Sequence, residues 1–146
     1  MMVLILLLAS WLIFRAGGAL GVHAFGTWHD TARYALAVMF AFTGMAHFTR
    51  MRHDLVKMVP SFVPQPMAVI YFTGVLEWLG AVGLLVPRLQ RWAGLGLIVM
   101  LAAMFPANVK AGLQAIPLRG KAATPLWLRT PMQLLFIGLL WWSTRA

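Results

Sequence analysis

The chain has 146 residues, enough for one domain, and 62% of them are hydrophobic while only 10% are charged. This composition excludes a soluble globular protein and indicates a protein embedded in a membrane. Twelve Lys and Arg residues oppose three acidic residues, but they fall mostly at the edges of apolar runs, which indicates lipid headgroup contacts and not nucleic-acid binding. The absence of cysteine excludes disulfide exchange, thiolate catalysis and Cys-ligated metal sites.

The first apolar segment covers residues 2–14, is interrupted by Arg15 and continues in small and apolar residues. A secretory signal peptide is one interpretation, but no basic residue precedes the apolar core and no A-x-A-like cleavage site is clear. We therefore expect an uncleaved transmembrane helix over about residues 2–24. Gly17 and Gly21 stand four residues apart on it, a spacing that allows another backbone to approach closely.

A short polar stretch, residues 27–33, leads into a second predicted span over about residues 34–49. Charged residues follow and mark an exit to water. Apolar residues recur at helical spacing opposite these charges, which predicts a short amphipathic helix on the lipid headgroups. They are Met51, Leu55, Met58, Val59 and Phe62.

The third predicted span, residues 66–87, has Glu77 as its one charged residue. A helix of this length covers about 33 Å, close to the roughly 30 Å thickness of the hydrocarbon layer. Glu77 lies near its middle, where an acidic side chain costs at least about 2.5 kcal/mol. Such a residue needs a partner, a proton or access to water, so Glu77 is a functional candidate.

The fourth predicted span, over about residues 92–110, contains Pro106 and Asn108. Proline inside a helix frees the carbonyl four residues earlier, that of Ala102, and predicts a kink. A kink beside Asn108 is either a binding feature or a packing feature, and the sequence favours neither.

Residues 111–130 form the longest predicted loop, and the last span begins at one of two Thr-Pro pairs. A start at Pro131 leaves only about 15 residues, roughly 22 Å, which is too short to cross the bilayer. We therefore expect the helix to begin at Pro125, with Thr124 as its cap, and to kink at Pro131.

The predicted fold is an all-α membrane protein, a bundle of five transmembrane helices with its termini on opposite faces. Seven basic residues fall on the face of the N-terminus and four on the other. The positive-inside rule therefore predicts a cytoplasmic N-terminus and a periplasmic C-terminus. Tryptophans that resemble an interfacial aromatic belt gather on the second face: Trp28, Trp92, Trp141 and Trp142.

Polar residues inside the predicted spans collect in the half of the bundle nearest the N-terminal face. Thr43 and His47 stand one helical turn apart on the second span, and Thr73 and Glu77 stand one turn apart on the third. We predict a polar pocket that opens to the cytoplasm and has Glu77 as its floor. Its candidate residues are Thr43, His47, Thr73, Glu77, Asn108, Arg129 and Gln133.

Each candidate also has a structural interpretation. A threonine in a transmembrane helix usually bonds its own backbone, and His47 can bridge helices or lie at the interface. Gln133 can be a helix cap, and Arg129 can extend to the headgroups. Arg15 and Glu77 stand at similar distances from the starts of their helices, which predicts an ion pair between them. The His and acid positions match no metal-binding motif, so no metal site is expected.

Five stretches, in this order and spacing, resemble the DoxX-like family of small bacterial membrane proteins over about residues 32–144. They are GMAHF at 44–48, MVPSFVPQP at 58–66, YFTGVLEWLGAVGLLVPR at 71–88, MFPANVKAG at 104–112 and LRTPMQLLF at 128–136. The resemblance implies a four-helix membrane domain over residues 32–146, with residues 1–31 as an additional N-terminal helix and short loop. It also implies a place in the bacterial inner membrane.

The DoxX-like family takes its name from small subunits associated with a thiosulfate:quinone oxidoreductase, so the resemblance implies a link to membrane redox chemistry. We expect an accessory or small-molecule-binding subunit, with a quinone as a candidate cofactor bonded through His47 or Glu77. The expected partners are the lipid bilayer and either other membrane redox subunits or further copies of this chain. Two alternatives remain: an assembly or chaperone partner without a ligand, and a proton-coupled carrier that uses Glu77, although no inverted repeat is evident.

Overall fold

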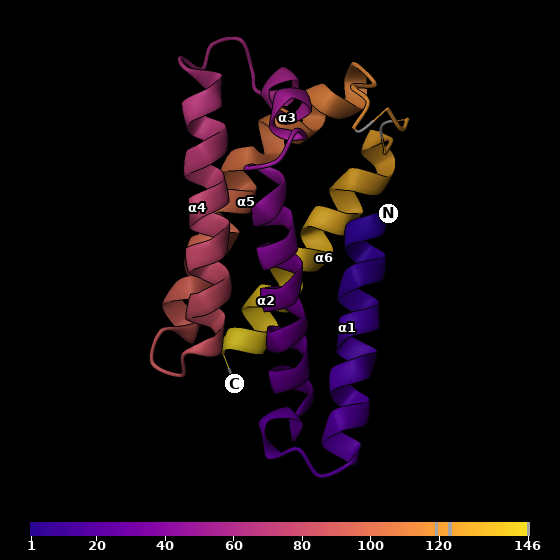
Figure 1. Ribbon diagram of the computed structural model, residues 1–146, viewed down its shortest axis with the longest axis vertical. Helices are drawn as coiled ribbons and strands as arrows, with labels where there is room; N and C mark the ends of the chain where they lie inside the picture. The colour runs from indigo at the N-terminus through magenta and orange to yellow at the C-terminus, as the bar shows by residue number, and fades with distance from the viewer. Residues whose placement is uncertain (119, 123, 146) are drawn as a thin grey trace.

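The computed structural model describes residues 1–118, 120–122 and 124–145, and the regular elements in them are helices (Figure 1). The predicted all-α fold class is confirmed for these residues. In chain order the elements are α1 (Met2–Ala19), the 3₁₀ helix η1 (His23–Phe25), α2 (Trp28–Ala46), α3 (Arg52–Met58), α4 (Pro66–Leu85), α5 (Gln90–Leu113) and α6 (Leu126–Thr144).

Three helices, α1, α4 and α5, are long and apolar enough to cross a membrane, with 18, 20 and 24 residues. They indicate a membrane protein. Helices α2 and α6 have 19 residues each but carry more polar side chains, among them Asp30, Arg33 and Arg129. That all five long helices span the bilayer therefore stays a prediction.

Helix α1 ends five residues earlier than predicted, and Gly21 lies beyond its end with a φ of 97°. The prediction that Gly17 and Gly21 share one helix face is therefore wrong. The close approach occurs at Gly18 instead, where a Cβ would lie 2.2 Å from the carbonyl oxygen of Phe25. The turn between α1 and α2 thus folds back onto the last residues of α1.

Helix α2 begins six residues before the predicted span because Thr27 caps it. The Thr27 hydroxyl accepts a hydrogen bond from the backbone N–H of Asp30 at 3.0 Å. At the other end of the chain, α6 has Pro125 as its cap residue and shows no side-chain cap, so Thr124 does not have the predicted role. The helices α5 and α6 continue through Pro106 and Pro131.

Helix α2 is central to the bundle. It packs against α1, α4 and α6, and α5 in turn packs against α4 and α6. The helices alternate in direction, and α6 crosses behind α2 at a steep angle (Figure 1). The hydrophobic core includes side chains from all five long helices: Leu7, Leu36, Phe40, Leu84, Leu97 and Leu140.

The predicted amphipathic helix is confirmed as α3, but its apolar side contacts protein. Met58 packs with Ala111 near the end of α5 and with Ile116 in the loop after it, and the Lys110 Nζ donates a 2.7 Å hydrogen bond to the Val59 carbonyl. The Phe62 side chain, predicted to share this face, is 79% exposed. Helix α3 and the loop after α5 therefore cover the same end of the bundle (Figure 1).

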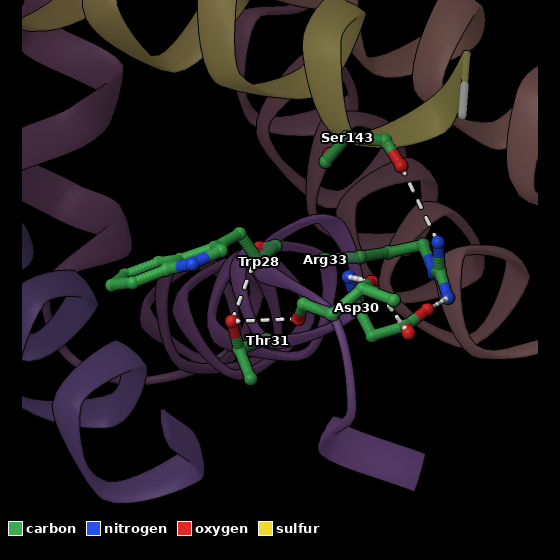
Figure 2. A network of polar contacts seen from close by, with 6 residues as sticks. Trp28, Asp30, Thr31, Arg33 and Ser143 are labelled. Carbon is green, nitrogen blue, oxygen red and sulfur yellow. Dashed lines mark hydrogen bonds and ion pairs between the residues drawn. The ribbon is translucent and has the colours of Figure 1, made fainter. Parts of the chain in front are cut away.

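At the opposite end, Arg33 joins the start of α2 to the end of α6. Its guanidinium pairs with the Asp30 carboxylate and donates to the Ser143 carbonyl at 3.3 Å (Figure 2). The His29 and Trp142 rings also stack between these helices, with centroids 4.1 Å apart. This network fixes α6 against α2 at the end remote from α3.

Glycines let α4 approach its neighbours closely, which gives a stability prediction. A Cβ on Gly74 would lie 2.6 Å from the His47 Cβ, whereas a Cβ on Gly96 would meet nothing within 4 Å. We expect Gly74→Ala to lower the free energy of unfolding by about 1–3 kcal/mol through overpacking. Gly96→Ala, the control, should be neutral or stabilising because alanine favours a helix. Thermal unfolding in detergent measures both variants, and equal midpoints would contradict the packing.

The Asp30–Arg33 pair gives a second stability prediction. Burial raises the pKa of Asp30, but hydrogen bonds with Thr27 and Arg33 outweigh it, so the pKa lies below its ordinary value of 3.8. The carboxylate therefore stabilises the fold above that pH, and this contribution is lost as the pH falls through the lower pKa of the folded state. We expect Asp30→Asn to cost about 2 kcal/mol at neutral pH because Arg33 is buried.

The control for Asp30→Asn is Lys57→Gln, which removes an exposed cation from the Asp54–Lys57 pair. This change should cost less than about 1 kcal/mol. Urea unfolding at neutral pH compares the two variants. An Asp30→Asn protein as stable as the wild type would mean that the Asp30–Arg33 pair does not stabilise the fold.

Candidate functional site

A cavity of about 550 Å³ lies at the end of the bundle covered by the loop between α5 and α6. Helices α2, α5 and α6 and the first residues of the chain form its sides. Four of the seven candidate residues line it: Thr43, Asn108, Arg129 and Gln133. A smaller hollow of about 270 Å³ between α4 and α5 is lined by apolar residues and glycines and includes none of the candidates.

A chain of hydrogen bonds crosses the cavity from the loop to α5. Arg129 donates from Nε to the Thr124 carbonyl at 2.8 Å and from Nη1 to the Asn108 Oδ1 at 3.3 Å. Asn108 donates to the Gln133 Oε1 at 2.8 Å, and Gln133 donates to the Leu101 carbonyl at 2.6 Å. Gln133 is therefore a buried link between α5 and α6 and not a helix cap.

The α5 carbonyl that accepts from Gln133 lies next to the one that Pro106 frees. Pro106 has no N–H, so the carbonyl of residue 102 lacks its bond from residue 106. The sequence pointed to the carbonyl of Ala102, whereas the bond from Gln133 goes to the adjacent Leu101. Asn108, two residues after the proline, accepts the hydrogen bond from Arg129 on the same side of α5 as Leu101.

The cavity presents hydrogen-bond donors and positive charge. Arg129 uses two of its five N–H groups in the bonds above, and Lys121 is a second cation among the lining residues. None of the described lining residues is acidic. A ligand here would therefore meet donors and would bind through acceptor oxygens.

Apolar lining residues complete the cavity, and the sequence analysis did not identify them. Met132 and Phe136 lie on α6 beside the polar chain. Each follows a candidate residue by three positions, Arg129 and Gln133 respectively, so helical spacing alone places them on the same face.

Glu77 lies behind the cavity and does not line it. Its side chain is at the contact between α2 and α4, where it is 4% exposed. The Oε2 atom has no hydrogen-bond partner among the described groups. Thr43 is the candidate residue of α2 that lines the cavity.

His47 shares the α2–α4 contact with Glu77. Its Nδ1 lies 3.1 Å from the Thr43 carbonyl, and its Nε2 is buried with no partner in the described part of the chain. Thr73 is different, because its hydroxyl bonds the Val69 and Ile70 carbonyls of its own helix, each at 3.0 Å. Neither residue lines the cavity, so the structure separates both from the polar chain on α5 and α6.

The predicted ion pair between Arg15 and Glu77 is wrong. The Arg15 guanidinium lies over the Trp28 ring, 4.3 Å from its centroid, and the two ion pairs among the described residues involve neither Arg15 nor Glu77. The prediction assumed that α1 and α4 begin at the same level. Instead, α1 begins well below the start of α4 in Figure 1, which places Arg15 at the level where α2 starts.

Comparison with known proteins places the chain in a family without assigning an activity. No curated protein and no solved structure matches it, and the described residues contain no group of three or more His, Cys, Asp or Glu that could hold a metal ion. Residues 36–144 match a family described as a domain of unknown function, DUF8561. This range includes all seven candidate residues and most of the chain, so the protein belongs to the DUF8561 family.

Proposed function

We propose that the protein is a membrane-embedded binding protein whose cavity holds a small amphipathic molecule with acceptor oxygens, such as a quinone. The observation that carries this proposal is the position of Arg129 between apolar side chains, a cation with N–H donors that no described residue uses. A quinone has carbonyl oxygens that accept hydrogen bonds and an apolar ring, so its chemistry complements both parts of the cavity.

The size and lining of the cavity support a ligand of this class. Ligand pockets typically enclose about 300–1,000 Å³ and combine mostly apolar linings with a few placed polar groups. Here the cavity encloses about 550 Å³. Asn108 and Gln133 hold Arg129 in place, so its orientation does not have to be fixed by the ligand.

The resemblance to DoxX-like proteins supports the wider setting of the proposal. In that setting the protein lies in the bacterial inner membrane, all five long helices span the bilayer, and the ligand is exchanged with membrane redox subunits. His47 and Glu77 are not the groups that bond the oxygens in this proposal, because neither lines the cavity. That role passes to Arg129.

Purification in a mild detergent, followed by mass spectrometry of the co-purifying quinones and lipids, tests the proposal. We expect the Arg129→Gln protein to carry about one tenth of the ligand that the wild type carries, or less. The reason is that a hydrogen bond to a charged group contributes about 1.5–3 kcal/mol. The matched control is Arg52→Gln, because Arg52 lies over Tyr71 and does not line the cavity. It should retain as much ligand as the wild type.

Two outcomes would reject the binding proposal. The wild type could carry no more quinone or lipid than an unrelated membrane protein purified in parallel, or the two arginine variants could retain equal amounts. Stoichiometric co-purification of another membrane protein in either case would favour the assembly-partner alternative.

The proposed orientation has its own test. With five spans and a cytoplasmic N-terminus, alkaline phosphatase fused after the last residue should be active, and a fluorescent cytoplasmic reporter at the same position should be dark. Reporter activities of the opposite sign would mean that the number of spans or the orientation differs from the proposal.

A further inference from the structure

Arg129 has hydrogen-bond donors that the described residues leave unused. Its Nε bonds the Thr124 carbonyl and its Nη1 bonds the Asn108 Oδ1, which accounts for two of its five N–H groups. The Nη2 atom makes no hydrogen bond with a described residue, and it is not among the fully buried polar atoms that lack a partner. Both terminal nitrogens of the guanidinium therefore have N–H groups available to a molecule in the cavity.

These donors suit an anion better than a neutral carbonyl group. A carboxylate or a phosphate has at least two oxygens spaced to accept parallel N–H groups from one guanidinium, and these charge-assisted bonds are about twice as strong as neutral ones. A quinone carbonyl offers a single uncharged oxygen. Because Thr124 and Asn108 already hold the guanidinium, its donors are oriented before a ligand binds.

A second cation, Lys121, lines the same cavity. Its backbone is fixed to that of Leu118 by two reciprocal hydrogen bonds, of 3.2 and 3.0 Å. Its ammonium group takes part in neither of the two ion pairs among the described residues, and its side chain is exposed. The cavity thus has two positive charges, one held in a fixed orientation and one on a flexible stem.

None of the three acidic residues of the protein is among the described residues that line the cavity. Asp30 pairs with Arg33 at the opposite end of the bundle. Asp54 pairs with Lys57 on α3, and Glu77 lies at the α2–α4 contact. Positive charge beside apolar walls is costly without a counter-charge, so an anionic ligand would be stabilised here.

Methionine is the commonest apolar residue among those described in the cavity lining. Four methionines contribute, and Phe136 is the one aromatic residue in the same set. A methionine side chain is unbranched and flexible, so it adapts to ligands of irregular shape. A wall of this kind accommodates an alkyl chain, whereas a flat ring gains most from aromatic neighbours. The methionines are Met1, Met2, Met51 and Met132.

We propose that the ligand of this cavity is an anionic amphiphile, an alkyl carboxylate or alkyl phosphate. Arg129 and Lys121 bind its head group, and its chain lies against the methionines. The proposal rests on the binding function proposed above and specifies the chemical class of the ligand. Two sources supply a head group of this class, the free acyl acids of the membrane and the phosphate groups of its lipids.

Native mass spectrometry of the full chain in a neutral detergent at pH 8 tests the class with four probes. Laurate and dodecyl phosphate carry the anionic groups, dodecanol has a chain of the same length without charge, and decylubiquinone represents the quinones. We expect at least one of the two anions to bind at least about tenfold more tightly than dodecanol. The anion that binds more tightly identifies the source as an acyl acid or a lipid phosphate.

Lys121→Gln is the most informative variant, because its exposed side chain makes no ion pair with a described residue and its loss should not disturb the fold. It should weaken binding of the anion by about threefold and leave dodecanol unchanged. Arg129→Gln should abolish the preference for an anion over dodecanol. The matched control is Arg52→Gln, which should keep the full preference because Arg52 does not line the cavity.

The outcomes separate this proposal from the binding function on which it rests. Anions that bind no more tightly than dodecanol would overturn the anionic class. If decylubiquinone then bound to the wild type and not to Arg129→Gln, the binding function would stand without it. Failure of all four probes to bind would reject both. A preference for anions that persists unchanged in both Lys121→Gln and Arg129→Gln, or that falls equally in Arg52→Gln, would also overturn the proposal.

Discussion

The close packing of α2 against α4 is the constraint on which the rest of the structure depends. Gly44 and Gly74 remove the side chains that would hold the helices apart, and Trp78 and His47 occupy the space each leaves. The Trp78 Nε1 also donates to the Ala41 carbonyl at 3.1 Å, which ties α4 to the backbone of α2. Helix α2 also contacts α1 and α6, whose residues line the cavity beside Thr43.

Two sets of polar groups in the bundle bond one another across helices, as expected where lipid offers no hydrogen bonds. The chain from Thr124 through Arg129, Asn108 and Gln133 to Leu101 joins the loop, α5 and α6. At the opposite end, Arg33 joins α2 to the Ser143 carbonyl. Helix α6 is thus held at both of its ends by arginine side chains, and the contact at Arg129 borders the cavity.

Local patterns in the sequence were sufficient to predict the helices and part of the site. Apolar length predicted α1, α4 and α5, proline at the first position marked the start of α4, and depth along each helix brought Asn108, Arg129 and Gln133 together. Relations between helices were not predictable in this way. The Arg15–Glu77 pair failed because α1 is displaced along the bundle, and Glu77 does not line the cavity because of how α2 and α4 are rotated. Neither displacement nor rotation is a property of one segment.

The position of α1 has a consequence for how the DUF8561 family can vary. The family match begins within α2, at residue 36, yet Met2 and Val3 of α1 line the cavity beside the polar chain. A family member with a different preceding segment would present a different surface opposite the polar chain. Exchange of this flanking helix would therefore change one wall of the cavity without altering the matched region.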